Sequence, residues 1–249
     1  EKRSRRGSID FDFPETRIIL DEEGRLVEIE KEDRRIANRM IEEFMLVTNE
    51  TIAEEMYWGD LPFLYRIHEN PDVEKIEEFN KFIHNFGYNI KGSQEIHPKE
   101  LQSLAEEVKG KKEEVLINTL LLRSLKKARY SSENEVHFGL AAKYYCHFTA
   151  PIRRYPDLQI HRIIKSYING KLNPIEQERL EVLLPKVAEH TSITERTAEE
   201  AEREVEDLKK AEYMSERIGE EYEGIISSLT HFGMFIQLDN TIEGLVHFS

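Results

Sequence analysis

The residues best suited to chemistry lie together in one short segment, HFTAPIRRYPDLQIHR, at 147–162. Two adjacent guanidinium groups, Arg153 and Arg154, stand just before Pro156 and Asp157, which begin an expected helix. Free N–H groups at a helix start favour an anion, and arginine supplies paired donors that suit phosphate oxygens. The segment therefore predicts a phosphate-holding site. A structural loop built on arginine–carboxylate pairs is the alternative interpretation.

Three further side chains of the same segment extend this interpretation. Tyr155 offers an aromatic ring for stacking, and His161 and Arg162 lie one turn into the expected helix. Together with the paired arginines and the helix start, these side chains fit the same phosphate-holding site.

The composition limits which protein classes remain. The chain has 249 residues, of which 39% are hydrophobic, and its formal net charge is −14, which excludes a simple basic nucleic-acid binder. Its single cysteine, Cys146, excludes an internal disulfide framework and a cysteine-based zinc site, and fits a reducing compartment. No apolar run reaches transmembrane length and no signal core follows the first charges. We expect a cytoplasmic protein with no membrane partner.

The elements that must position the segment follow from hydrophobic periodicity and from helix-start and helix-stop residues. We expect a helix-rich α+β fold, in which the early strands normally pair with strands from outside this chain. Pro185 is expected to kink or restart the longest helix. The expected elements are strands 17–20 and 26–29, helix 33–56, strand 64–68, helices 71–86, 98–110, 113–127, 156–168 and 173–218, and strands 222–229, 231–238 and 243–247.

The last thirty residues change character, since apolar and polar residues alternate there as in strands. We place a domain boundary near Gly219, with one domain at 1–219 and a second, incomplete one at 220–249. The glutamate-rich stretch 195–223 is interpreted as a solvated helix face. Both ends of the chain look cut, because three strands alone make an open sheet with bare edges.

Several segments of the sequence resemble a known family. HFTAPIRRYPDLQIHR is similar to the C-terminal signature of the catalytic RNB domain of ribonuclease II / ribonuclease R exoribonucleases, with the closer match to the ribonuclease R branch. The tail EGIISSLTHFGMFIQLDNTIEGLVHFS resembles the first half of an S1-like RNA-binding module of the OB-fold type. Other resembling segments occur in family order, namely RRGSIDF, ETRIIL, IEEFMLVTNE, LYRIHE, LLRSLKKARY, HFGLA and TERTAEEAEREV.

The resemblance implies processive 3′→5′ hydrolysis of single-stranded RNA to mononucleotides, assisted by Mg²⁺. It implies that Arg153 touches the scissile phosphate, where its charge would neutralise the growing phosphoryl charge. Arg154 and Tyr155 would contact the RNA backbone or brace the loop. Phe11 would pack against the last bases of the strand.

Further contacts are implied at the RNA end and in the tail. Glu43, rather than Glu42, would reach the terminal ribose, where a carboxylate accepting from the 2′-OH distinguishes RNA from DNA. Glu202, with Glu195 as the second choice, would approach the 3′ end. In the S1-like tail the residues implied to stack bases are Phe232, Phe235 and His247. The basic residues Lys2, Arg3, Arg5 and Arg6 are open between RNA contact and a merely exposed segment.

One family feature is missing. The aspartate cluster that holds the family's magnesium ions, IDP-x-x-A-x-D-x-D-D, does not occur in the chain, and only Asp10 and Asp12 approach it. We therefore expect that the chain alone holds no metal, is inactive alone, and needs the N-terminal half of the catalytic domain as its partner. Exposed surface left by that missing half predicts either self-association or a rearranged, partly disordered N-terminal region. A non-catalytic module that binds single-stranded RNA is the alternative function.

Overall fold

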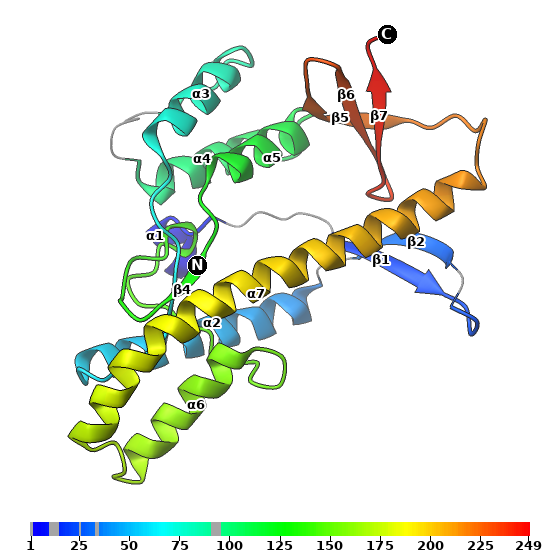
Figure 1. The fold of residues 1–249 in the computed structure, drawn as a ribbon. Helices are drawn as coiled ribbons and strands as arrows, with labels where there is room; N and C mark the ends of the chain where they lie inside the picture. The colour runs from blue at the N-terminus through cyan, green and yellow to red at the C-terminus, as the bar shows by residue number, and fades with distance from the viewer. Residues whose placement is uncertain (1, 10–14, 25, 33–34, 91–95) are drawn as a thin grey trace.

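The computed structural model describes the chain except for residues 1, 10–14, 25, 33–34 and 91–95 (Figure 1). Helices dominate the described residues, and the strands form three small antiparallel sheets. The expected helix-rich α+β class is confirmed. Among the described helices, none combines the length and the apolarity that a membrane-spanning segment needs.

The N-terminal part contains α1 (Lys2–Arg6), β1 (Glu15–Leu20), β2 (Leu26–Glu32) and α2 (Ile36–Trp58). β1 and β2 form an antiparallel hairpin, and the turn between them uses Gly24 at a φ of 78°. These strands pair with each other, as do β3 (Tyr65–Ile67) and β4 (Arg129–Ser131). Each of these strands is paired along one edge within the chain, so the expected pairing with strands from outside the chain stays a prediction.

Three helices after β3 build one of the two hydrophobic cores. They are α3 (Val73–His84), α4 (Pro98–Val108) and α5 (Glu114–Ser124), and each begins near its expected start. Ile83, Leu101, Ile117 and Leu121 are fully buried in this core, whereas Leu122 is 48% exposed. The leucine run of α5 therefore lies only partly in the core.

The other core is built where α6 (Tyr155–Ile168) packs against α7 (Pro174–Ser215) and the β3–β4 pair. Ile160 and Ile163 of α6 are buried there with Leu180 and Leu184 of α7. The Asn173 side chain accepts the Glu176 N–H at 3.0 Å and caps α7. Pro185 lies inside α7 without ending it, so the expected restart does not occur.

α7 spans 42 residues, or about 60 Å at the α-helical rise, and crosses the molecule beside α2 (Figure 1). Beyond it, β5 (Gly224–Leu229), β6 (Gly233–Leu238) and β7 (Glu243–His247) form a sheet in the order β5-β6-β7. Gly233 is required in β6, because a Cβ there would lie 2.6 Å from the Val246 carbonyl oxygen. Arg123 of α5 donates to Ser228 of β5 at 3.2 Å and ties this sheet to the helices.

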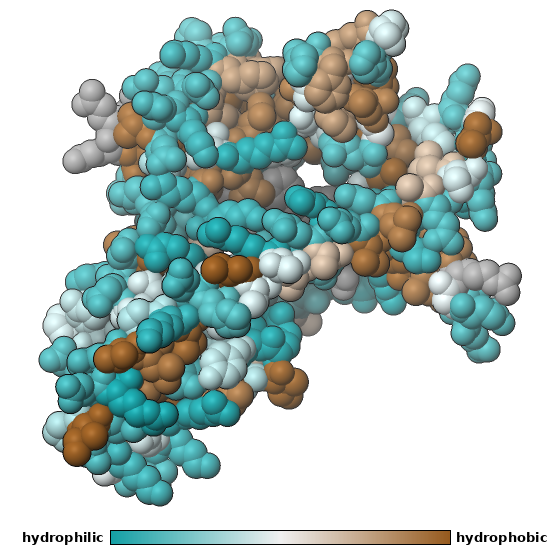
Figure 2. Space-filling model, viewed as in Figure 1, coloured by the Kyte–Doolittle hydropathy of each residue, from teal (hydrophilic) through white to brown (hydrophobic). Residues whose placement is uncertain are grey.

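Apolar side chains remain exposed on the C-terminal sheet. Figure 2 shows brown side chains gathered on these strands, which stand above the end of α7. The exposed large hydrophobic residues of the sheet and its flanks are Ile225, Ile226, Leu229, Phe232, Leu245, Val246 and Phe248. Three strands with an exposed apolar face leave this sheet able to accept further structure or a ligand.

Candidate nucleic-acid interface

The loop before α6 is organised by a buried carboxylate. Asp157 is completely buried, and its Oδ2 accepts the backbone N–H of Ala150 at 2.8 Å. The same oxygen accepts Nη2 of Arg154 at 2.8 Å and Nε at 3.2 Å. Asp157 lies in the first turn of α6, where its negative charge also matches the positive end of the helix dipole. The helix start and Arg154 are therefore already neutralised from within the chain.

Arg153 differs from its neighbour. Its backbone N–H is turned back to the Ala150 carbonyl at 3.3 Å, and its side chain is exposed. Across the described part of the chain, Arg153 forms no side-chain ion pair. The alternative interpretation of the loop, with arginine–carboxylate pairs, thus holds for Arg154 alone. Arg153 is left with its donors free for an external anion.

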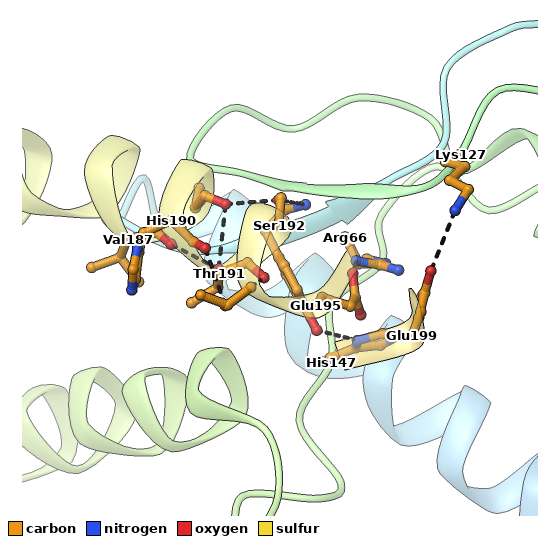
Figure 3. A network of polar contacts seen from close by, with 12 residues as sticks. Arg66, Lys127, His147, Val187, His190, Thr191, Ser192, Glu195 and Glu199 are labelled. Atoms are coloured by element: carbon orange, nitrogen blue, oxygen red, sulfur yellow. Dashed lines mark hydrogen bonds and ion pairs between the residues drawn. The ribbon is translucent and has the colours of Figure 1, made fainter. Parts of the chain in front are cut away.

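A second arginine reaches the same region from β3. Arg66 Nη1 lies 2.6 Å from Glu195 Oε2 of α7, and its guanidinium stacks on the Tyr130 ring at 4.6 Å (Figure 3). The Tyr130 hydroxyl hydrogen-bonds Nδ1 of His147 at 2.9 Å, which links the loop to β4. Glu195, the second choice for the RNA 3′ end, is thereby occupied by a protein cation.

His147 lies at the meeting point of these arginines. Burial, together with the nearby positive charges of Arg154, Arg66 and Arg153, lowers the pKa of His147 to about 2. The buried imidazole is therefore neutral, and three guanidinium groups lie near enough to act on it. Because Arg66 and Arg154 have carboxylate partners, the uncompensated positive charge in this group belongs to Arg153.

Buried polar groups of α2 fix the segment that leads into the loop. Asn49 is 3% exposed, and its side-chain oxygen accepts the Phe148 N–H at 3.0 Å. The side-chain amide of Asn49 also donates to the Tyr145 hydroxyl at 3.1 Å. The Cys146 thiol donates to the backbone carbonyl of Asn49 at 3.3 Å. These contacts hold residues on both sides of His147 against α2. The loop thus rests on α2 and α7 at the same time.

The other predicted residues of the segment have different surroundings. His161 stacks on Phe148 with ring centroids 4.1 Å apart, and its Nε2 contacts the Phe148 carbonyl at 3.0 Å. His161 therefore braces the loop through that nitrogen. Tyr155 is 48% exposed and Arg162 is also exposed, so both side chains can reach a ligand.

Glu43 has a protein partner in the structure. Nε of Arg3 in α1 lies 3.1 Å and 3.2 Å from the two carboxylate oxygens of Glu43. Arg6 forms a second such pair with Glu50 at 2.8 Å. Two of the four basic residues at the start of the chain therefore dock α1 onto α2. Arg3 and Arg6 are therefore not part of a merely exposed segment, and contact of the four basic residues with RNA stays a prediction.

The remaining predicted residues divide into three cases. Glu202 is exposed on α7, two turns beyond Glu195. Phe11, together with Asp10 and Asp12, lies outside the described residues. In the C-terminal sheet the Phe232 ring lies 6.5 Å from Phe235 and 6.4 Å from His247, so the structure brings the three predicted stacking residues together.

The described residues contain no group of three or more histidine, cysteine, aspartate or glutamate side chains placed to hold one metal ion. Mg²⁺ needs several clustered hard oxygen ligands. The described residues therefore do not fit a catalytic magnesium site by themselves.

Sequence reasoning found the loop but missed the groups that support it. Arg66, Tyr130 and Asn49 were not singled out, although Arg66 and Tyr130 lie in the resembling segments LYRIHE and LLRSLKKARY. Asp157 was interpreted as a helix-start residue only. Its position three residues after Arg154 was the local signal for their ion pair.

Comparison with known protein families decides the relationship of the chain. Residues 1–170 match the RNB domain, and residues 215–249 match the S1 RNA binding domain. The chain belongs to the RNB-domain family. Ribonuclease R 1 of Lactococcus lactis is 54% identical over 248 residues, which cover 99% of this chain and 30% of that protein. Ribonuclease R of Thermotoga maritima is 45% identical over 253 residues, which cover 100% of this chain and 36% of that protein.

Solved structures agree with this assignment. Mycoplasma genitalium RNase R in complex with ribose methylated single-stranded RNA matches with a TM-score of 0.92 and 31% identity, over 99% of this chain and 39% of that chain. Yeast Ssd1, a pseudonuclease, matches with a TM-score of 0.70 and 26% identity, over 86% of this chain and 27% of that chain. The RNB-domain chain thus spans about a third of the curated relatives' length.

Proposed function

We propose that this chain is part of a processive 3′→5′ exoribonuclease that hydrolyses single-stranded RNA to nucleoside monophosphates in the cytoplasm. The observation that carries the proposal is the exposed guanidinium of Arg153, which has no carboxylate partner in the described residues while Arg66 and Arg154 have one each. Arg153 would bind the scissile phosphate and neutralise charge that grows on the phosphoryl oxygens. Positive charge on rigid elements needs little rearrangement during the reaction.

The other predicted contacts surround that role. Tyr155 would stack against RNA, and Arg154 would act through the loop that it braces. Glu202 forms no ion pair with a described residue, and its carboxylate would approach the 3′ end. Glu43 would accept the terminal 2′-OH beside Arg3, whose paired donors orient the carboxylate. The Phe11 contact with the last bases belongs to the same proposal.

Magnesium has a defined place in this proposal. Because the described residues do not fit a magnesium site, the ions would be held by another part of the complete enzyme. When bound, they supply Lewis-acid activation of water and of the leaving oxygen. The residues of this chain would bind and orient the RNA, and the chain alone would be inactive.

An exposed apolar stripe on α2 supports the need for a further part of the protein. Its residues are between 57% and 79% exposed, whereas the apolar face of an amphipathic helix normally packs against a partner. They are Ile36, Met40, Ile41, Phe44 and Val47. We expect the remaining half of the catalytic domain to cover them, and two copies of the isolated chain to associate through them.

The inactivity of the isolated chain can be measured directly. The purified chain is incubated with end-labelled single-stranded RNA and Mg²⁺, beside its longer parent protein. We expect mononucleotide release from the parent only, because the clustered oxygen ligands are missing from the described residues. Release by the chain itself that persists after Asp10→Ala would contradict this expectation.

Binding tests the role of Arg153 separately from catalysis. Arg153→Ala should weaken single-stranded RNA binding about tenfold at low salt. It should also reduce, by about one, the slope of the logarithm of the binding constant against the logarithm of the salt concentration. The matched control is Arg179→Ala, which removes the same charge from an exposed arginine at the start of α7. The control should stay within about twofold, since long-range electrostatics change equally in both variants. Equal losses in the two variants would show that Arg153 has no specific contact.

A non-catalytic RNA-binding module is the second candidate. The converging rings of Phe232, Phe235 and His247, and the likeness to a pseudonuclease, favour it. The nuclease assay on the parent separates the two candidates. A parent that binds RNA tightly yet releases no mononucleotides would support the binding module.

A further inference from the structure

A cavity of about 500 Å³ lies between the end of α2, the segment that follows it, the segment after β4, and α7. Four aromatic rings line it: Tyr57 and Trp58 from α2, then Phe63 and Tyr65. Tyr57 and Trp58 meet edge to face at 5.4 Å and are 42% and 70% exposed. None of the residues proposed to contact RNA lines this cavity.

The charged groups of the cavity are all carboxylates. Asp60, Glu133 and Glu181 line it and are exposed, and none forms an ion pair with a described residue. No lysine, arginine or histidine is among the lining residues. Asn134 adds a buried side-chain oxygen that receives no hydrogen bond, while its amide donates to the Lys143 carbonyl at 3.2 Å. The cavity therefore carries negative charge and no positive charge, beside the hydroxyl and indole donors of Ser132, Tyr57, Tyr65 and Trp58.

The same aromatic group already attracts one cation at its edge. The Lys143 ammonium lies 5.1 Å from the centre of the Tyr144 ring, and the Tyr144 ring packs against Tyr57 with centroids 4.6 Å apart and a tilt of 39°. Lys143 does not line the cavity, so this cation stays outside it. Aromatic faces attract ammonium groups, and desolvation strengthens that attraction.

We propose that this cavity binds a free aliphatic diamine or polyamine. Methylene groups would lie against Trp58 and Tyr57, and the terminal ammonium groups would donate to Asp60, Glu133 and Glu181. A ligand with two or more separated cations is favoured because the carboxylates come from three different segments of the chain. The volume suits a small molecule, since ligand cavities commonly measure about 300–1,000 Å³.

The chain carries its own reporter for this ligand. Trp58 is the single tryptophan of the sequence and lines the cavity, so its fluorescence reports occupancy. We would titrate the purified chain with the five-carbon diamine cadaverine and with the uncharged diol of the same length. The diamine should give a saturable change and the diol none. An equal response to the diol would overturn the proposal, because apolar contact alone would then explain it.

Two variants test the carboxylates. Glu133→Gln with Glu181→Gln should weaken cadaverine binding about tenfold, whereas Glu178→Gln, on the same exposed part of α7, should change it less than about twofold. Equal weakening by both would show general attraction to an acidic chain and overturn the site.

The titration is repeated with Nα-acetyl-lysine amide. Tighter binding of this probe than of cadaverine would overturn the assignment to a free polyamine in favour of a partner's lysine side chain.

Discussion

Replacing Asp157 by alanine is expected to lower the free energy of unfolding by about 3 kcal/mol, the lower end of the cost of breaking a buried ion pair. Its carboxylate is fully buried and holds both the Arg154 side chain and the Ala150 N–H. The variant would leave a guanidinium that is only 18% exposed without a partner. Thermal unfolding should shift down by about 6–12 °C for a chain of this size.

A surface pair provides the control for this measurement. Glu176 and Arg179 have the same three-residue spacing at 2.8 Å, but the Arg179 side chain is 67% exposed. Glu176→Ala should therefore cost no more than about 0.5 kcal/mol. The double variant Asp157→Asn with Arg154→Met should recover part of the loss, because a neutral pair leaves no buried charge. Equal destabilisation by Asp157→Ala and Glu176→Ala would contradict the organising role of Asp157.

Local signals predicted most helices correctly. Asn173 followed by Pro174 predicted the start of α7, and the periodic apolar residues of α2 predicted that helix. β4 was missed because it has only three residues and pairs with β3 across more than sixty residues of sequence. α1 was missed because its basic residues have no apolar period. Its docking depends on carboxylates forty residues away on α2.

The candidate site was predictable in its composition but not in its pairing. The adjacent Arg153 and Arg154 indicated an anion site, yet which of them was free depended on the carboxylate of Asp157 turning back into the loop. The pair between Arg66 and Glu195 joins residues 129 apart in the sequence. No local spacing encodes such a contact, because tertiary packing of α7 on β3 creates it.

Buried histidines should make the fold sensitive to mild acid. Burial lowers the pKa of His137 to about 3 and that of His147 to about 2, so both stay neutral in the folded chain. In the unfolded chain they gain protons below about pH 6.5, so acid favours unfolding. The full free energy of unfolding is therefore present above about pH 6.5, and it decreases as the pH falls toward the pKa values that the two histidines have in the folded chain. At about pH 5.5 the two histidines together should lower the free energy of unfolding by about 2–3 kcal/mol relative to neutral pH.

Denaturant unfolding at about pH 7.5 and about pH 5.5 measures this loss, and two variants assign it. His147→Gln removes one titrating group. It should reduce the difference in the free energy of unfolding between the two pH values by about 1 kcal/mol, even where it lowers stability at both. His84→Gln, at the exposed end of α3, should leave the difference unchanged. The effect of His147 reaches the proposed site, because protonation would place a fourth positive charge among Arg66, Arg153 and Arg154. An unchanged difference in His147→Gln would mean that this imidazole is not held neutral by the fold.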